Sequence, residues 1–255
     1  MKTIDDEDYC YIDLKYCPNH CIDKMGIQGN PCNEPLPMGR RPELMLKPLP
    51  PSKEKYIFCY DGDTGLRFDE NTRWTCLLQK YLGDEYQVIE EGLSGRTTVF
   101  DDPLHEGLNG LQLITPVLMS HEPVDLLIIM LGTNDTKVRF NCSAEAIGIG
   151  LQRLIKKAKD TECWTDKPNI LAICPKNIDH DYLTNQCALP MGLTCDKTSE
   201  GLSAAFKQAA ELTNVHYLDA NTLGLTNNTN DYMHLDAQSH KKLADYLSKL
   251  IPELL

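Results

Sequence analysis

The sequence lacks any long apolar run. Its longest such stretch, LLIIML from Leu126 to Leu131, is far shorter than the roughly 20 residues that a helix needs to cross a bilayer. Residues 1–50 also contain no apolar segment of the kind found in secretory signals. We therefore expect a cytoplasmic protein that has no membrane partner.

The sequence also has no excess of basic over acidic residues. The chain has 25 Lys and Arg against 37 Asp and Glu, for a net charge of −12. Proteins that bind nucleic acid need a basic surface that displaces counterions from the phosphates, so no nucleic-acid partner is expected. Hydrophobic residues make up 42% of the 255 residues and charged residues 24%. This composition and length suit one large α/β domain with a packed core.

Apolar periodicity is scarce in residues 1–53, which end in the Pro-rich stretch EPLPMGRRPELMLKPLPPSKE. This pattern predicts an irregular N-terminal extension with a linker, followed by a folded domain over residues 54–255. Within the extension, Cys17, His20 and Cys21 lie close together in the sequence with Cys32 further on, and thiols and imidazole are side chains that can bind zinc. Their spacing matches no familiar zinc finger, and a disulfide or unpaired thiols are the alternatives. We therefore expect neither a metal nor another cofactor.

The chain contains 11 cysteines, and an odd number cannot all pair within one chain. Cys59, Cys76 and Cys174 lie within apolar segments. A buried thiol behaves as a small hydrophobic residue, so these three are expected to belong to the core.

From residue 55 onward, apolar strand patterns alternate with helical patterns. Strands are expected at 55–60, 86–92, 124–131, 169–174 and 215–219, and helices at 72–82, 107–120, 143–159, 199–213 and 236–250, with a loop over 175–197. This alternation predicts a parallel sheet covered by helices on both faces. Ligands of such sheets bind beyond the carboxyl ends of the strands.

Polar residues suited to one chemistry follow three of these strands. Gly95 could bring a backbone N–H close to an oxyanion, and the amide of Asn134 could donate to the same charge. His234 could accept a proton near neutral pH, while Asp231, three residues earlier, could orient its ring through Nδ1. Together these groups could bind a tetrahedral oxyanion and take up a proton.

Each residue has a structural alternative. Gly95 could be an ordinary turn glycine, and Asn134 or Asp135 could bond to its own backbone in a strand-to-helix turn. His234 could be a surface or capping histidine, while Asp231 or Asp236 could supply the negative charge favoured at a helix N-terminus. The coincidence of all of them at strand ends favours the functional interpretation.

Three stretches carry a resemblance to a known family: RWTCLLQKYLGDEYQVIEEGLSGRTTVFDDP, DLLIIMLGTNDTK and DYMHLDAQSHKKLADYL. From about residue 55 to 255 the chain resembles the SGNH hydrolases, also called GDSL esterases, and most of all their arylesterase or acyltransferase-like branch. The resemblance implies a three-layer α/β/α flavodoxin-like fold with five parallel strands in the order 2-1-3-4-5. It assigns Gly95 and Asn134 to an oxyanion hole, His234 to the general base and Asp231 to its orienting partner.

The family's nucleophilic serine, in a Gly-Asp-Ser turn after the first strand, is missing. Residues 55–74 contain no serine. In one interpretation Thr64, in Gly-Asp-Thr, replaces it, since an activated threonine can attack a carbonyl. In the other, the turn is absent and this stretch is the loop that follows it in relatives. Only nine residues separate Thr64 from Trp74, which is short for the family and favours the second interpretation.

The resemblance implies an esterase that acts on small, short-acyl carboxylic esters. The missing serine keeps open the alternative of a catalytically impaired relative with a ligand-binding or structural role. Relatives of this branch often associate, so a homo-oligomer is one further expectation drawn from the resemblance.

Overall fold

The computed structural model describes residues 60–61, 66–186 and 188–255. The predicted N-terminal extension lies outside these residues, as does the predicted first strand except for Tyr60. The division of the chain at residue 53 therefore stays a prediction.

Three parallel strands form the centre of the described part of the chain. They are β3 (Leu127–Ile129), β4 (Ile170–Cys174) and β5 (His216–Asp219), in the order β3-β4-β5. Ile128 of β3 lies opposite Leu171 of β4, and Ala172 of β4 lies opposite Tyr217 of β5. The predictions for the last three strands and for a parallel sheet are confirmed.

β4 is buried along its whole length, as its continuous apolar sequence predicts for a strand covered on both faces. Its residues divide between two cores because side chains alternate across a strand. Ile170, Ala172 and Cys174 pack in one core, whereas Leu171 and Ile173 pack in the other. The sheet is therefore the middle layer of three.

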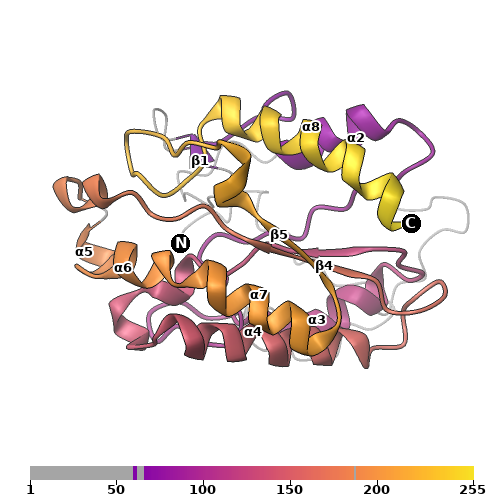
Figure 1. The fold of residues 1–255 in the computed structure, drawn as a ribbon, viewed down its shortest axis with the longest axis horizontal. Coiled ribbons are helices and arrows are strands. Elements are labelled where there is room, and N and C mark those ends of the chain that lie inside the picture. Colours follow the sequence, from indigo (N-terminus) through magenta and orange to yellow (C-terminus); the bar gives the residue numbers. More distant parts are fainter. Residues whose placement is uncertain (1–59, 62–65, 187) are drawn as a thin grey trace, which may run out of the picture. The chain divides into compact units, whose positions relative to one another are not determined.

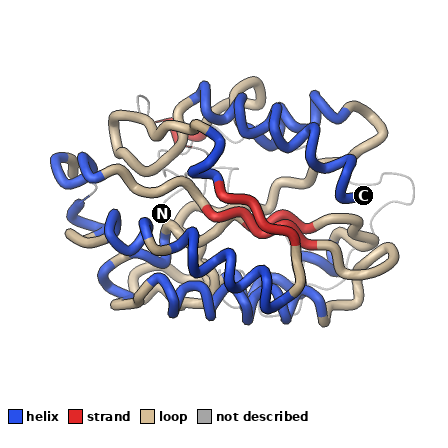
Figure 2. The backbone as a smooth tube through the Cα atoms, viewed as in Figure 1, coloured by secondary structure: helices blue, strands red, loops and turns tan. Residues whose placement is uncertain are grey.

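Helices cover both faces of this sheet, as Figures 1 and 2 show. One face is covered by α2 (Trp74–Leu82) and α8 (Ala237–Leu254), and the other by α3 (Gly110–Ser120), α4 (Ala144–Lys159) and α7 (Leu202–Thr213). All five helices lie close to their predicted positions. Side-chain caps fix three of the starts, because Asn109, Ser143 and Asp236 each accept a hydrogen bond from a backbone N–H of the first turn.

The predicted loop at 175–197 is wrong in part, because short helices form there. They are the 3-10 helix η4 (His180–Thr184), α5 (Ala188–Met191) and α6 (Cys195–Glu200). Tyr182 and Cys195 from this region are fully buried in a small separate core. Burial of their backbone requires paired N–H and C=O groups, which short helices provide locally. Three further 3-10 helices lie in the described part of the chain: η2 (Asn134–Thr136), η3 (Val138–Phe140) and η5 (Ala220–Leu223).

No strand is formed at 86–92, where the sequence predicts one. A strand is defined by backbone bonds to a neighbour, and the neighbour expected for this segment is 55–60, of which only Tyr60 is described. The backbone of Val88 instead donates to the side chain of Gln79. The order 2-1-3-4-5 is thus not confirmed. A short antiparallel pair, β1 (Tyr60–Asp61) with β2 (Leu66–Arg67), precedes α2.

Cys174 is fully buried, as predicted, whereas Cys76 is only partly buried and Cys59 lies outside the described residues. Burial raises the pKa of the Cys174 thiol to about 12, so it serves as a neutral core residue. Among the helices that the structure describes, none combines the length and apolar character needed to span a membrane.

Candidate functional site

The loop between β5 and α8 brings Asp231 and His234 together. Asp231 Oδ2 lies 2.9 Å from His234 Nδ1. Its other oxygen, Oδ1, accepts hydrogen bonds of 2.9 Å from the backbone N–H groups of Met233 and His234. The turn is therefore tight enough for an aspartate three residues before a histidine to fix the orientation of the imidazole ring.

Asp231 stays ionised although its side chain is 4% exposed. Burial by itself would raise its pKa, but the hydrogen bonds from the His234 ring and from backbone N–H groups outweigh burial and lower the pKa. Asn228 adds to this support, because its amide donates to Asp231 Oδ1 at 3.2 Å and its side-chain oxygen accepts from the Asp231 N–H. A persistent carboxylate here would stabilise a positive charge on His234.

Asn134 begins the 3-10 helix η2, five residues after the end of β3. The chain turns there at Gly132, whose φ of +120° disfavours any side chain. A Cβ at Gly132 would also lie 2.8 Å from Cζ of the Phe206 ring. Glycine is thus required at this position for two reasons, and it lies in the turn that leads from β3 to Asn134.

Gly95 lies in a turn with a φ of +80°, and a Cβ there would meet the side chain of Leu108 at 2.8 Å. The turn leads into Thr97, whose backbone pairs with Leu108 and Gly110. This geometry agrees with a structural need for glycine and equally leaves the backbone open to close approach by a ligand.

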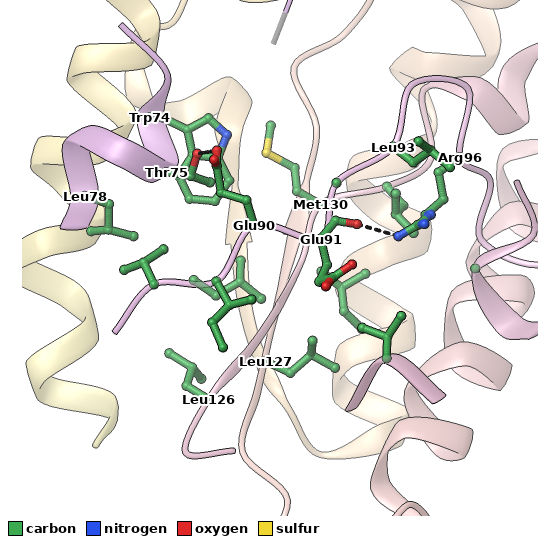
Figure 3. A pocket seen from close by; sticks show the side chains of 18 of the residues that line it. Trp74, Thr75, Leu78, Glu90, Glu91, Leu93, Arg96, Leu126, Leu127 and Met130 are labelled. Atoms are coloured by element: carbon green, nitrogen blue, oxygen red, sulfur yellow. Dashed lines mark hydrogen bonds between the residues drawn. The ribbon is translucent and has the colours of Figure 1, made fainter. Parts of the chain in front are cut away.

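Gly95, Asn134 and His234 line the same cavity, whose volume is about 710 Å³. Glu90 and Glu91 project into it from the segment before Gly95, and Trp74, Thr75 and Leu78 border it from α2 (Figure 3). The structure thus gathers three of the predicted site residues at one cavity, and Asp231 adjoins them through His234.

Thr64 lies outside the described residues, and so do the weak metal candidates Cys17, His20, Cys21 and Cys32. Within the described ranges, no group of three or more His, Cys, Asp or Glu side chains is placed to hold a metal ion.

Asp135 is a residue whose contacts the sequence did not predict. It follows Asn134 and is completely buried, and its Oδ1 accepts from both the N–H and the hydroxyl of Thr98, at 2.9 and 2.5 Å. Its Oδ2 has no hydrogen-bond partner in the described part of the chain. Burial raises the pKa of Asp135 to about 6, although the bonds from Thr98 act in the opposite direction. The carboxylate therefore joins the turn after Gly95 to the turn that carries Asn134.

His240 is a second unpredicted neighbour of the cavity. Its ring is buried in the first turns of α8, and its Nδ1 accepts from the backbone N–H of Trp74 at 3.3 Å. Burial, and then repulsion by a charge on His234, lower the pKa of His240 to about 4. His240 therefore stays neutral near pH 7 and satisfies an N–H at the start of α2. A His six residues after His234 is visible in the sequence, but its partner in α2 is not.

Asp236 has the structural role that the sequence left open for it. It caps α8, accepting from the Ser239 N–H at 2.7 Å and from the Thr226 hydroxyl at 2.6 Å. The two aspartates that flank His234 thus differ, since only Asp231 contacts the imidazole.

Comparison with known proteins agrees with this fold. The model of the GDSL-like Lipase/Acylhydrolase family matches residues 60–242. An aryl esterase from M. smegmatis is 31% identical, with a TM-score of 0.66 over 74% of this chain and 88% of that one. A carbohydrate acetylesterase from Sinorhizobium meliloti is also 31% identical, with a TM-score of 0.66 over 74% of this chain and 89% of that one.

None of the curated proteins matches the sequence. The family match spans well over half of the chain, and the solved relatives share its α/β architecture with a parallel sheet. The chain therefore belongs to the GDSL-like lipase/acylhydrolase family, whose SGNH-type members include aryl esterases and acetylesterases.

Proposed function

We propose that this chain hydrolyses small, short-acyl carboxylic esters at the cavity that Gly95, Asn134 and His234 line. The observation that carries the proposal is the 2.9 Å contact between His234 Nδ1 and Asp231 Oδ2 beside this cavity. A histidine oriented by a buried carboxylate is suited to accept and return a proton. Membership in an ester-hydrolase family supports the same reaction class.

In this proposal the hydroxyl of Thr64 attacks the ester carbonyl carbon, and His234 takes the hydroxyl proton. The carbonyl oxygen becomes an oxyanion, which the N–H of Gly95 and the amide of Asn134 stabilise. The intermediate expels the alcohol, and His234 returns its proton to the leaving oxygen. A water molecule, deprotonated by His234, then attacks the acyl-threonine, releasing the acid and restoring the Thr64 hydroxyl.

The test is hydrolysis of a short-chain aryl ester by the wild type, His234→Ala and Thr64→Val. Val is matched to Thr in shape and lacks only the hydroxyl. The proposal expects both variants to lose the catalysed rate. Equal rates in the wild type and His234→Ala would refute it. A loss in His234→Ala with none in Thr64→Val would retain the base and reject Thr64 as nucleophile.

The alternative is a catalytically impaired relative that binds an acylated or carbohydrate ligand or has a structural role. The absence of serine from residues 55–74 favours it. A fluorophosphonate probe separates the two proposals, because it labels an activated nucleophile covalently. Stoichiometric labelling at one mapped residue would exclude the impaired form, whereas no labelling together with no hydrolysis would support it.

A further inference from the structure

Arg96 follows Gly95 directly in the chain and lines the same cavity. The two residues end a tight turn, in which the Arg96 N–H donates to the Leu93 carbonyl at 3.0 Å and Gly95 has a φ of +80°. The side chain of Arg96 extends toward Glu91 on the cavity wall (Figure 3). Because neighbouring Cα atoms are about 3.8 Å apart, Arg96 brings a cation to the part of the cavity where Gly95 would bind an oxyanion.

The guanidinium of Arg96 uses only part of its hydrogen-bonding capacity within the described residues. Nη1 donates to the backbone carbonyl of Glu91 (Figure 3). Nε is shielded from water and has no acceptor in the described part of the chain. No described group accepts a hydrogen bond from Nη2 either. The edge formed by Nε and Nη2 is therefore available for a partner that accepts two hydrogen bonds.

The charge of Arg96 also lacks a close partner, since no ion pair joins it to a carboxylate of the described chain. Glu91 is the acidic residue whose charge acts on it, but Glu91 Oε1 lies 2.7 Å from His121 Nε2 and its side chain is 44% exposed. Burial lowers the pKa of the half-buried Arg96, yet a guanidinium stays protonated in proteins. Because a shielded cation without a counter-charge is costly, the arrangement favours an anion in the cavity.

Arg73 shows how the same edge of a guanidinium is used elsewhere in this chain. Its Nε and Nη2 donate to the two carboxylate oxygens of Glu90, at 3.1 and 3.0 Å. Such paired hydrogen bonds fit a planar carboxylate in both geometry and charge. A rotation of the Arg96 guanidinium that turned its Nε–Nη2 edge into the cavity would let a ligand carboxylate satisfy both donors. This geometry identifies a carboxylate as the anion that suits Arg96.

We propose that Arg96 determines substrate specificity by binding a carboxylate on the alcohol part of the ester, so that the preferred substrates are short-acyl esters of alcohols or phenols that carry a carboxylate. This inference rests on the proposed ester hydrolysis. A short acyl group needs little of the cavity volume of about 710 Å³, which leaves room for a larger alcohol part.

The cation at Arg96 must act locally, because the chain as a whole has a net charge of −12 and repels anions at a distance. Lys176, in the loop after β4, is another cation that lines the cavity. Its Nζ lies 3.7 Å from Asp179 Oδ1, so a neighbouring carboxylate already offsets its charge. Arg96 is therefore the better candidate for the residue that binds the carboxylate.

Two esters of matched shape test the proposal: 4-acetoxybenzoate, which carries a carboxylate, and 4-acetoxybenzamide, which is neutral. In Arg96→Gln the amide can still donate to the Glu91 carbonyl, but the charge is lost. The ratio of kcat/KM for the charged ester to that for the neutral one should fall about 10- to 100-fold, as expected for a lost hydrogen bond to a charged group. Arg153→Gln, on the exposed side of α4 and outside the cavity, makes the same change in net charge and should leave the ratio unchanged.

Equal losses for the two esters in Arg96→Gln would show that Arg96 only supports the turn through Glu91, and would overturn the proposal. A fall of the ratio in Lys176→Gln, with none in Arg96→Gln, would overturn it as well. If Arg96→Gln fails to fold, the wild-type ratio decides after each rate is divided by the rate of hydroxide-catalysed hydrolysis. A corrected ratio of one or less would then count against the proposal.

A binding measurement separates this inference from the proposed function. If the wild type cleaves neither ester, ester hydrolysis is refuted, and calorimetry with the intact 4-acetoxybenzoate decides the role of Arg96. Saturable binding that weakens about 10-fold or more in Arg96→Gln, but not in Arg153→Gln, would support a carboxylate site at Arg96. Absence of binding to the wild type, or equal affinity in the wild type and Arg96→Gln, would overturn it.

Discussion

Thr98 and Asp135 form the contact that joins two of the candidate site's turns. Asp135 Oδ1 accepts both the N–H and the hydroxyl of Thr98, and the carboxylate is fully buried. Gly95 lies three residues before Thr98, and Asn134 directly precedes Asp135. The position of the Gly95 turn relative to the Asn134 amide therefore depends on one buried carboxylate.

We expect Asp135→Asn to change how stability depends on pH. The folded-state pKa of Asp135, about 6, lies above the ordinary value of 3.8. Stability linked to this group is therefore fully present below about pH 4 and is lost as the pH rises toward about 6. The substituted amide keeps an acceptor oxygen for Thr98 but carries no charge. Relative to the wild type, the variant should gain about 2–3 kcal/mol between these pH values. Urea denaturation of both proteins at each pH measures this, and parallel pH profiles would contradict it.

Asp231→Asn should lower kcat of the proposed ester hydrolysis by a factor on the order of 10³–10⁴, with little change in KM, because the imidazole loses the carboxylate that fixes its tautomer. Asp236→Asn is the matched control. It lies two residues beyond His234, and asparagine is as good a helix cap as aspartate. Steady-state kinetics of the two variants should differ widely. Similar losses in both would show that the turn as a whole, and not the contact with the imidazole, supports activity.

Glu90→Gln should destabilise the fold by about 1–3 kcal/mol at neutral pH, since Glu90 accepts from Arg73 Nε and Nη2 at 3.1 and 3.0 Å. Burial opposes ionisation of Glu90, but the bonds from Arg73 and Thr75 prevail and lower its pKa to about 2. Because the pKa of Glu90 is lower in the folded state, its ion pairs stabilise the fold at pH values above the unfolded-state pKa, near 4.5. This stabilisation is lost as the pH falls toward 2.

The deficit of Glu90→Gln should therefore shrink in acid, which urea denaturation at about pH 7 and about pH 3 would reveal. Glu91→Gln is the control at the neighbouring position, where the side chain is 44% exposed and contacts His121. Its effect should stay below about 1 kcal/mol. A deficit for Glu90→Gln that is constant with pH would rule out the ion pairs as its origin.

Gly132→Ala should cost more stability than Gly83→Ala. Both glycines have positive φ, at +120° and +80°, so both substitutions strain the backbone. A Cβ at Gly83 meets nothing within 4 Å, whereas one at Gly132 lies 2.8 Å from the Phe206 ring. We expect about 1–2 kcal/mol for Gly83→Ala and about 3 kcal/mol or more for Gly132→Ala. Thermal unfolding measures both, and equal losses would show that Phe206 moves aside freely.

The alternation of apolar periods was enough to predict the three last strands and all five long helices. Apolar residues that recur every 2 or every 3.6 positions indicate which face of a strand or helix is buried. Such elements can therefore be predicted without tertiary information. The same holds for Asp231 and His234, because a contact between residues three positions apart depends only on a local turn. The wrong prediction of a loop at 175–197 has a different origin. The short helices there pair backbone groups that are buried in a small core around Tyr182, and the sequence of this segment shows no strong apolar periodicity that would predict them.

The sequence by itself determined the α/β class, the parallel strands and the residue types at their carboxyl ends. Tertiary structure alone decided that Asp135 bonds to Thr98, 37 residues away in the chain, and that His240 supports the start of α2, 166 residues from Trp74. Such partners are chosen by burial, because a polar atom that is removed from water must bond to whichever segment the fold places beside it. Local sequence patterns do not indicate which segment that neighbour will be. This is why candidate residues for the site could be proposed from the sequence, whereas the long-range contacts that hold them in place could not.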